Sequence, residues 1–334
     1  ANTHTGGTTV NQGTIIITNS GALSTNASAV IACNNGGALT FGRNDTFGNH
    51  AAAVVVPLVI NAGGTVRNNG AWFNSLGPVA MNGGALDAVG GASANFPSWG
   101  LKGAVTAGNN STSTISAAGA YAGAALGEAS VTGTVFDVQA GSTLIVSATL
   151  SDGRNTGNTA FQASFLAKTG AGTLTLAGVN SFTGGTIVSN GTLTVNGSLT
   201  NANITIAGGT MNGSGKLYYQ LADDVADRIR ISGSGLIDIG GLTLHVVKSG
   251  AQSGTEFVVI DDTNKGGGAS TEKTLAIVEK AKANGIVPEL SFVLGNPPDA
   301  AADSRQTIEF IRKVKTLNPA AEIILYMYTP VPLA

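Results

Sequence analysis

The sequence predicts a mainly β protein, a parallel β-helix followed by a small α/β tail. Three observations lead to this prediction: a short strand phrase recurs along residues 1–270, no helical period interrupts it, and the composition changes after residue 270. The chain has 334 residues, of which 48 are Gly, and only 11% are charged. Glycine is about twice as frequent as in average proteins, and charged residues are well under half the usual share.

The recurring phrase is a Gly or Asn-Gly followed by a short segment in which apolar side chains alternate with Thr or Ser. Alternation at period two is typical of a strand with one buried face. Gly and Asn supply turn positions with positive φ, and Thr suits the outward positions of a pleated surface. The phrases are Gly13–Ile17, Gly37–Phe41, Gly64–Val66, Gly84–Asp87, Gly141–Val146, Gly172–Leu176 and Gly191–Val195.

The phrases are spaced by roughly 10 to 30 residues, and strands with turns at this density indicate a sandwich, a barrel or a solenoid. Self-similar phrases and small residues favour a solenoid, because stacked coils repeat one unit and need tight corners. Aromatic residues make up only 5% of the chain, which suits a thin, repeated core. A sandwich, or several small β modules, remains the alternative.

The last part of the chain differs in composition. Residues 271–334 hold 2 of the 48 Gly and 14 of the 36 charged residues. The Gly-rich stretch 265–270 lies at this change and indicates a flexible joint. We therefore divide the chain into a β-helical domain, 1–264, a joint, 265–270, and an α/β tail, 271–334.

The tail pattern predicts the order α-β-α-β, a piece of a parallel α/β sheet. Apolar residues recur at helical spacing in both predicted helices, and short apolar runs form the two strands. The expected elements are a helix over Thr271–Asn284 closed by Gly285, a strand over Leu290–Leu294, a helix capped by Asp303 and ended by Asn318 and Pro319, and a strand over Ile323–Tyr328.

Composition also excludes several classes. The 17 Lys and Arg nearly balance the 19 Asp and Glu, so nothing favours nucleic-acid binding. No run of about 18 apolar residues occurs, which argues against a transmembrane helix. Cys33 is the single cysteine, so a disulfide scaffold is impossible.

Residues Lys168–Val188, continuing through Asn190–Val195, resemble the autotransporter-associated β-strand repeat of bacterial passenger domains. Tyr219–Asp262 is similar to the last passenger coils of that family, with Ala226–Ile229 as the shared phrase. The resemblance implies a secreted, surface-displayed, right-handed β-helix, with a host surface, a glycan or matrix as partner. The family's C-terminal membrane barrel and a signal peptide are both missing from the pattern, so we expect a passenger fragment.

The tail resembles the late part of a radical S-adenosylmethionine barrel of the cobalamin-binding subgroup. That family needs three Cys thiolates, usually C-x-x-x-C-x-x-C, to hold a [4Fe–4S] cluster. The single Cys33 cannot supply them, so we expect no enzyme from the tail alone. The shared phrases are Gly285–Val287, Phe292–Pro297, Thr307–Phe310 and Tyr328–Pro332.

The two resemblances belong to unrelated families, and a fusion or chimeric origin accounts for both. We expect a non-enzymatic stalk or adhesin-like display protein at the cell surface, with no catalytic, cofactor-binding or metal residues. The alternatives are a polysaccharide-acting β-helix enzyme, or a radical S-adenosylmethionine fragment without its cluster. The amphipathic tail helices also suggest a cap for the open last coil of the β-helix.

The densest charge cluster in the β part is the best enzymatic candidate, although a solvated turn explains it more simply. General acid/base chemistry needs two carboxylates aimed at one bond, and sequence neighbours on a strand point to opposite faces. The cluster comprises Asp223, Asp224, Asp227, Arg228 and Arg230. Two further motifs fail on their ligand positions: Gly209–Leu217 as a phosphate loop, and Asp261–Glu272 as a calcium loop.

Other chemistry-bearing residues have structural interpretations. His4, His50 and His245 are far apart and show no ligand spacing, and we interpret Cys33 as a small core residue. Four aromatic residues near the middle of the chain could stack on sugars, but we expect them to fill a gap in a core of small residues. They are Trp72, Phe73, Phe96 and Trp99.

Overall fold

The computed structural model describes residues 5–19, 23, 28–47, 56–129, 131–201, 203–221, 229–248, 260–262, 271–295 and 299–327. The chain forms two compact units, Ala1–Asn264 and Lys265–Ala334. Each unit has its own hydrophobic core.

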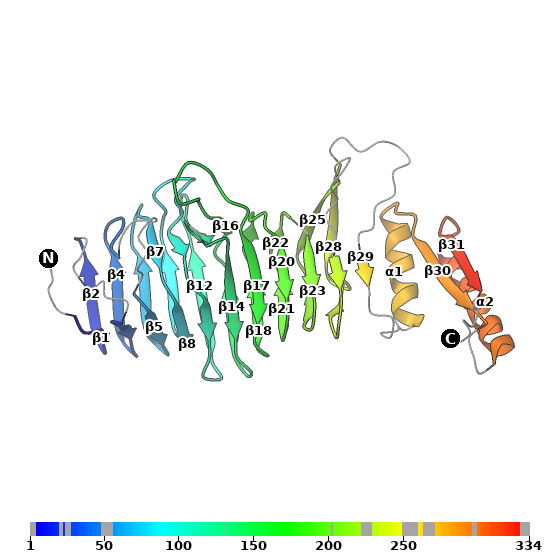
Figure 1. The fold of residues 1–334 in the computed structure, drawn as a ribbon, viewed down its shortest axis with the longest axis horizontal. Coiled ribbons are helices and arrows are strands. Elements are labelled where there is room, and N and C mark those ends of the chain that lie inside the picture. Colours follow the sequence, from blue (N-terminus) through cyan, green and yellow to red (C-terminus); the bar gives the residue numbers. More distant parts are fainter. Residues whose placement is uncertain are drawn as a thin grey trace, which may run out of the picture. The chain divides into compact units, whose positions relative to one another are not determined.

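The first unit is a β-helix in which successive coils add one strand to each of its sheets (Figure 1). Neighbouring strands of these sheets pair in parallel, as the solenoid prediction requires. The first sheet is ordered β1 (Thr8–Val10), β3 (Ile31–Cys33), β5 (Leu58–Asn61), β8 (Val79–Asn82), β11 (Val105–Ala107), β14 (Gly133–Val138), β17 (Phe165–Thr169), β20 (Thr186–Val188), β23 (Ile204–Ile206), β26 (Ile229–Ile231) and β29 (Ile260–Asp262).

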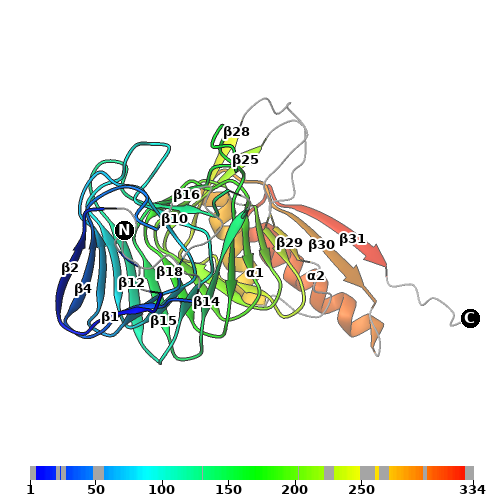
Figure 2. The ribbon, with the colours of Figure 1, turned by 60° about the vertical axis from the view of Figure 1, so that its left-hand side comes forward.

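Three further sheets complete the coils: a second sheet, and two four-stranded sheets that form the early and late parts of the third side. The coils wind around a common interior (Figure 2). The second sheet is ordered β2 (Gly13–Ile17), β4 (Gly37–Phe41), β6 (Thr65–Asn68), β9 (Ala85–Ala88), β12 (Thr112–Ala117), β15 (Thr143–Val146), β18 (Thr173–Leu176), β21 (Thr192–Val195), β24 (Thr210–Gly213) and β27 (Leu236–Ile237). The early third sheet contains β7 (Asn74–Leu76), β10 (Trp99–Leu101), β13 (Ala124–Leu126) and β16 (Leu150–Asp152). The late third sheet contains β19 (Val179–Asn180), β22 (Ser198–Leu199), β25 (Lys216–Leu221) and β28 (Thr243–Lys248).

The seven strand phrases of the sequence all fall in the second sheet. Their Gly residues lie in or shortly before the strands, and apolar residues at alternate positions face the interior, whereas Ile16 is 59% exposed. Because pairing is in register, identical positions of successive coils stack into continuous rows, which keeps the core uniform. One such row is Leu86, Ile115, Val146, Leu176 and Val195.

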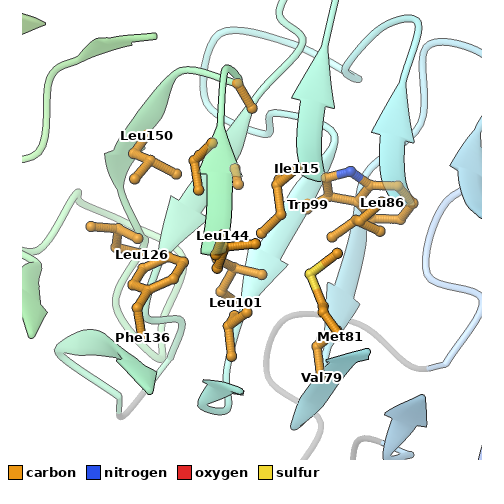
Figure 3. Close-up of a cluster of buried hydrophobic side chains, with 14 of the residues drawn as sticks. Val79, Met81, Leu86, Trp99, Leu101, Ile115, Leu126, Phe136, Leu144 and Leu150 are labelled. Atoms are coloured by element: carbon orange, nitrogen blue, oxygen red, sulfur yellow. The ribbon is translucent and has the colours of Figure 1, made fainter. Parts of the chain in front are cut away.

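Side chains from all three sheets meet in the interior (Figure 3). Phe136 of the first sheet, Leu144 of the second and Leu126 of the third are each fully buried. Burying one such side chain stabilises a fold by about 1.5–3 kcal/mol. The narrow core therefore derives its stability from repetition along the solenoid.

Coils differ in length. In the repeat region Thr192 pairs with Thr210, so one coil covers residues 192–209. Earlier, Thr112 pairs with Thr143, so one coil covers residues 112–142 and is much longer. The additional residues of the long coils include the segments before and after the strands of the early third sheet.

An asparagine ladder runs along the corner after the first sheet. Asn34 Nδ2 donates to Asn11 Oδ1 at 2.7 Å, and Asn61 Nδ2 donates to Asn34 Oδ1 at 2.7 Å. Asn82 Nδ2 continues the ladder to Asn61 Oδ1 at 3.0 Å. Gly108 takes the equivalent position of the next coil and ends this row of amides. The ladder links these coils by side-chain hydrogen bonds in addition to the sheet pairing.

Lys168 occupies an inward position of the first sheet, between Phe136 and Val188 of the neighbouring coils. The residue is fully buried, and burial lowers the pKa of its ammonium to about 8, with Asp137 opposing that change. Its Nζ donates to the main-chain carbonyls of Thr169, Gly170 and Asn190 at 2.5, 2.6 and 3.1 Å. These bonds tie two successive corner turns together.

The second unit has the predicted order α-β-α-β. Its strands form a two-stranded parallel sheet, and its buried hydrophobic cluster comes from both helices and from the turn before the second strand. The elements are α1 (Thr271–Ala283), β30 (Glu289–Leu294), α2 (Ala300–Leu317) and β31 (Glu322–Met327).

The helix ends of the second unit explain two of the sequence signals. Gly285 has φ +68° and, with Ile286, closes α1 by bonds to the carbonyls of Lys282 and Ala281. The expected cap of α2 at Asp303 is wrong. Asp299 is the cap and accepts hydrogen bonds from two main-chain nitrogens, whereas Asp303 lies in the first turn.

Candidate functional site

The outward face of the early third sheet is buried beneath loops. Leu76 and Leu101 point into the core, and the residues between inward positions, such as Ser75, Gly100 and Ala125, point outward. Those three are also buried. A second packed layer therefore lies outside this sheet, between its strands and the connecting loops.

Glu128, just after β13, belongs to this layer and is 1% exposed. Its side chain extends back over Gly100 of the preceding coil, and its Oε2 accepts a hydrogen bond from Ser75 Oγ two coils away at 3.4 Å. A Cβ at position 100 would lie 2.7 Å from Glu128 Cγ and 2.8 Å from Phe73 Cζ. Glycine at position 100 is what makes room for both side chains.

Burial raises the pKa of Glu128 to about 7. The positive charges of Lys102 and Arg154 and the hydrogen bond from Ser75 oppose that increase in pKa. The carboxylate of Asp45 adds to it. The carboxyl group is therefore close to half-protonated at neutral pH. This deeply buried carboxyl group therefore changes charge near neutral pH.

A small hairpin carries Arg154 beside this layer. Arg154 pairs with Phe161 as an antiparallel bridge. The guanidinium carbon lies 4.9 Å from the centroid of the Phe161 ring and 5.6 Å from that of Phe96. Its Nε and Nη2 donate to the side-chain and main-chain oxygens of Asn158 at 2.5 and 2.8 Å. Stacking and hydrogen bonds together fix the hairpin tip.

The loops enclose a pocket of about 220 Å³. Phe73 and Phe96 form its aromatic side, with ring centroids 5.2 Å apart and planes at 64°. The Phe73 main chain is held by Asn44 and Asp45, because Phe73 N donates to Asn44 Oδ1 at 2.6 Å and Asp45 N donates to Phe73 O at 3.0 Å. The lining residues are Asn44, Asp45, Phe73, Ala92, Phe96 and Asn158.

The arrangement suits binding better than acid/base chemistry. Glu128 does not line the pocket, and the ring of Phe73 lies beside its carboxyl group. Asp45 is the one carboxylate among the lining residues, whereas acid/base cleavage of a glycosidic bond uses two. No group of three or more His, Cys, Asp or Glu in the described part of the chain could hold a metal ion.

The four aromatic residues singled out in the sequence do not form one cluster. Trp99 fills the core as expected, fully buried and in edge-to-face contact with Phe41 at 5.4 Å. Phe73 is also buried, at 4% exposed, but in the layer outside the third sheet, and the prediction is wrong for Phe96, which lies partly exposed in the pocket wall. Both residues precede the strands β7 and β10 in connecting segments, so strand alternation could not place them.

The remaining candidates fall elsewhere. Of the charge cluster, Asp223, Asp224, Asp227 and Arg228 lie outside the described residues, and Arg230 is exposed on β26. In the phosphate-loop motif Lys216 begins strand β25, so no helix N-terminus is available for a phosphate. Most of the calcium-loop motif lies outside the described residues.

The histidines and the cysteine add no site. His4 and His50 lie outside the described residues, and His245 belongs to β28. Cys33 is fully buried between Val10 and Ile60 of the neighbouring coils. Burial raises the pKa of its thiol to about 11, which keeps it protonated and unreactive.

Sequence reasoning missed the charged residues of the layer. Lys102, Glu128 and Arg154 follow β10, β13 and β16, and they are evenly spaced along the chain. Only about 8% of residues 1–270 are charged, so this even spacing was a usable signal. It marks the coil period of the early third sheet, which the strand phrases of the second sheet do not reveal.

One family match is found. Residues 1–17 and 166–195 match the passenger-associated-transport-repeat. The chain carries a passenger repeat. The second segment coincides with strands β17 to β21, and the first includes strands β1 and β2.

The match supports a secreted or surface-exposed β-helix of the autotransporter passenger type. It covers no residue of the tail, so the radical S-adenosylmethionine resemblance remains a prediction. Comparison with curated proteins and with solved structures gave no match. Among the described helices, neither is long and apolar enough to cross a membrane.

Proposed function

We propose that this chain is the passenger part of an autotransporter-like protein and works outside the cell as a non-enzymatic display scaffold with an adhesin-like role. The passenger repeat within the solenoid is the observation that carries this proposal. The repeat segment 166–195 spans short coils with tight turns and contributes rows to the same core as the long coils. The solenoid is thus a continuous support, and the loops of the long coils are the displayed part.

Surface exposure of intact source cells tests the location. We expect an antibody against the solenoid to label unpermeabilised cells, and added protease to remove the label. A cytoplasmic protein of the same cells serves as the control and should remain intact. Detection of the chain only after permeabilisation would overturn the proposal.

The alternative is a polysaccharide-acting enzyme, and the early third sheet is where such an activity would reside. The burial of Glu128 behind Phe73 argues for a structural part for this carboxyl group. We expect no release of reducing ends and no unsaturated product from a panel of neutral and acidic polysaccharides. Turnover by the wild-type chain that disappears in Asp45→Asn would establish the enzyme instead.

The tail is proposed to be non-catalytic. A [4Fe–4S] cluster needs a set of thiolate ligands, and the single Cys33 is buried in the solenoid. Anaerobic reconstitution with iron and sulfide should therefore give no cluster absorption band. Appearance of that band in the full chain, and its loss in Cys33→Ser, would contradict this assignment.

A further inference from the structure

The pocket beside the early third sheet offers two amide groups whose orientation is fixed. Asn44 Oδ1 accepts from Phe73 N at 2.6 Å, and Asn158 Oδ1 accepts from Arg154 Nε at 2.5 Å. An amide oxygen that accepts a hydrogen bond identifies the other terminal atom as the NH₂ group. Both residues line the pocket, which makes their Nδ2 groups the candidate donors for a ligand.

Two aromatic rings give the pocket an apolar side, in contrast to its polar amide groups. Phe73 and Phe96 meet edge to face and give the pocket an apolar wall. Phe96 is backed by the Arg154 guanidinium, and Phe73 by the buried side chain of Glu128. Both rings are therefore supported from behind, which limits the ordering that a ligand would have to impose.

The size and charge of the pocket restrict the ligand. A volume of about 220 Å³ is smaller than the 300–1,000 Å³ that is usual for drug-sized ligands, so one ring fits. The carboxylate of Asp45 lines the pocket and disfavours an anion. Arg154 already bonds Asn158 and stacks on two rings, so it is poorly placed to attract an acidic group.

A hexose ring has the matching chemistry, with an apolar face of C–H groups and a rim of hydroxyl oxygens that accept hydrogen bonds. We propose that this pocket binds one uncharged hexose unit of a glycan, with the ring against the partly exposed Phe96, which the buried Phe73 supports, and hydroxyl oxygens on the amides of Asn44 and Asn158. The inference rests on the proposed display function and names the ligand class and the place where it binds.

Binding of simple glycosides to the full chain tests the proposal. The probes are the methyl glycosides of glucose, galactose and mannose, with methyl glucuronide as the anionic comparison, and binding is followed by ligand-observed NMR and calorimetry. We expect at least one neutral glycoside to bind and the glucuronide to bind more weakly. Absence of binding by all three neutral glycosides would overturn the proposal.

Isosteric substitutions place the binding at the pocket. Asn44→Asp and Asn158→Asp keep the accepting oxygen and the local fold, but replace the donor by a second oxygen. Each should weaken binding about tenfold, because the amide donor is lost, the hydroxyl must turn to donate instead, and a second carboxylate enters a pocket that Asp45 already lines. Asn196→Asp is the matched control. Asn196 Oδ1 also accepts a main-chain hydrogen bond, from Ser214 N, and Asn196 does not line the pocket. Equal loss in all three variants, or in none, would place the ligand elsewhere.

An aromatic pair gives a second test. Phe96 lines the pocket, and Phe161 stacks on the same guanidinium without lining it. Phe96→Ala should abolish measurable binding, while Phe161→Ala should retain it. Loss of sugar binding in both variants would show that the position of Arg154 matters and would contradict a direct contact between Phe96 and the sugar. Failure of sugar binding alone leaves the labelling of intact cells unchanged, so the two proposals fail separately.

Discussion

The coils of residues 58–165 and the repeat coils of residues 166–217 use one core and differ in what lies outside it. Rows of apolar residues continue from one region into the other without a change of register. The early coils are long, as the pairing of Thr112 with Thr143 shows, and carry a buried outer layer with Glu128. The repeat coils are shorter, and Val179 on their third face is 61% exposed.

The two regions therefore share the core that holds the solenoid together and differ in the loops that lie outside it. Most interior positions hold apolar side chains, with the inward Lys168 as an exception, whereas the corners tolerate insertions. The inserted loops provide further places for buried polar groups. Among the described residues of the repeat coils, the only fully buried charge is Lys168, which bonds to main-chain carbonyls.

The largest expected loss of stability comes from core substitutions, which test whether the core is equally well packed in both regions. Leu144 and Leu193 occupy one row of the second sheet, with Leu174 between them, and both are fully buried. Leu144→Ala and Leu193→Ala should each cost about 2–5 kcal/mol of unfolding free energy, because each leaves a cavity. Urea unfolding of the full chain measures both. A cost below about 1 kcal/mol in one region would show that its core is loosely packed.

The buried carboxyl group gives the early coils a pH dependence. Burial raises the pKa of Glu128 to about 7, so between about pH 4.5 and 7 the folded chain holds a proton that the unfolded chain releases. Stability from this group is complete below pH 4.5 and is lost as the pH rises through 7, by on the order of 3 kcal/mol. The urea midpoint should therefore fall across this range in the wild type.

Glu128→Gln removes the titrating carboxyl group and should make the urea midpoint less dependent on pH. The variant should match the wild type near pH 4 and exceed it at pH 8, since an amide keeps the contact with Ser75 without a charge. Asp87→Asn is the control, because that carboxylate forms an exposed ion pair with Arg67. An unchanged slope in Glu128→Gln would show that another group titrates.

The repeat coils should show the opposite sign at higher pH. Burial lowers the pKa of Lys168 to about 8, so between about pH 8 and 10.5 the unfolded chain binds a proton that the folded chain has released. Stability should rise with pH in this window, by on the order of 3 kcal/mol. Lys168→Met should remove the rise, whereas the exposed Lys313→Met should keep it. A rise that persists in Lys168→Met would contradict this assignment.

The smallest expected change in stability comes from substitutions on the early and late third sheets. Gly100→Ala places a methyl group against Glu128 and Phe73 and should cost about 1–3 kcal/mol. Val179→Ala removes an exposed side chain and should change stability by about 0.5 kcal/mol or less. Differential scanning calorimetry distinguishes them. A neutral Gly100→Ala would show that the outer layer readily repacks.

Much of the solenoid was predictable because one physical rule repeats. Alternation after Gly located seven of the ten strands of the second sheet. Strands β12, β24 and β27 were missed, and β12 was missed because Thr112–Ala117 follows Ser111 and a run of Asn instead of a Gly phrase. The tail elements followed from helical spacing and from the stop signals at Gly285 and Asn318.

The pocket was not predictable from local patterns. Phe73 and Phe96 lie on different coils, and whether either faces the core or the loops depends on strand register. Glu128 appears in the sequence as an isolated charge between Gly127 and Ala129. Its importance arises only when Gly100, one coil earlier, leaves the space that its side chain occupies.

The constant offset in the repeat region makes this solenoid adjustable in length. Thr186 pairs with Ile204, Thr192 with Thr210 and Ser198 with Lys216, so the three sides of this coil share one offset. Duplication of one whole coil, such as residues 192–209, would therefore preserve the register on all three sides at once. Each duplicated unit would move the outer loops about 4.8 Å along the axis. Such a chain can change its reach by gene duplication without redesigning its core.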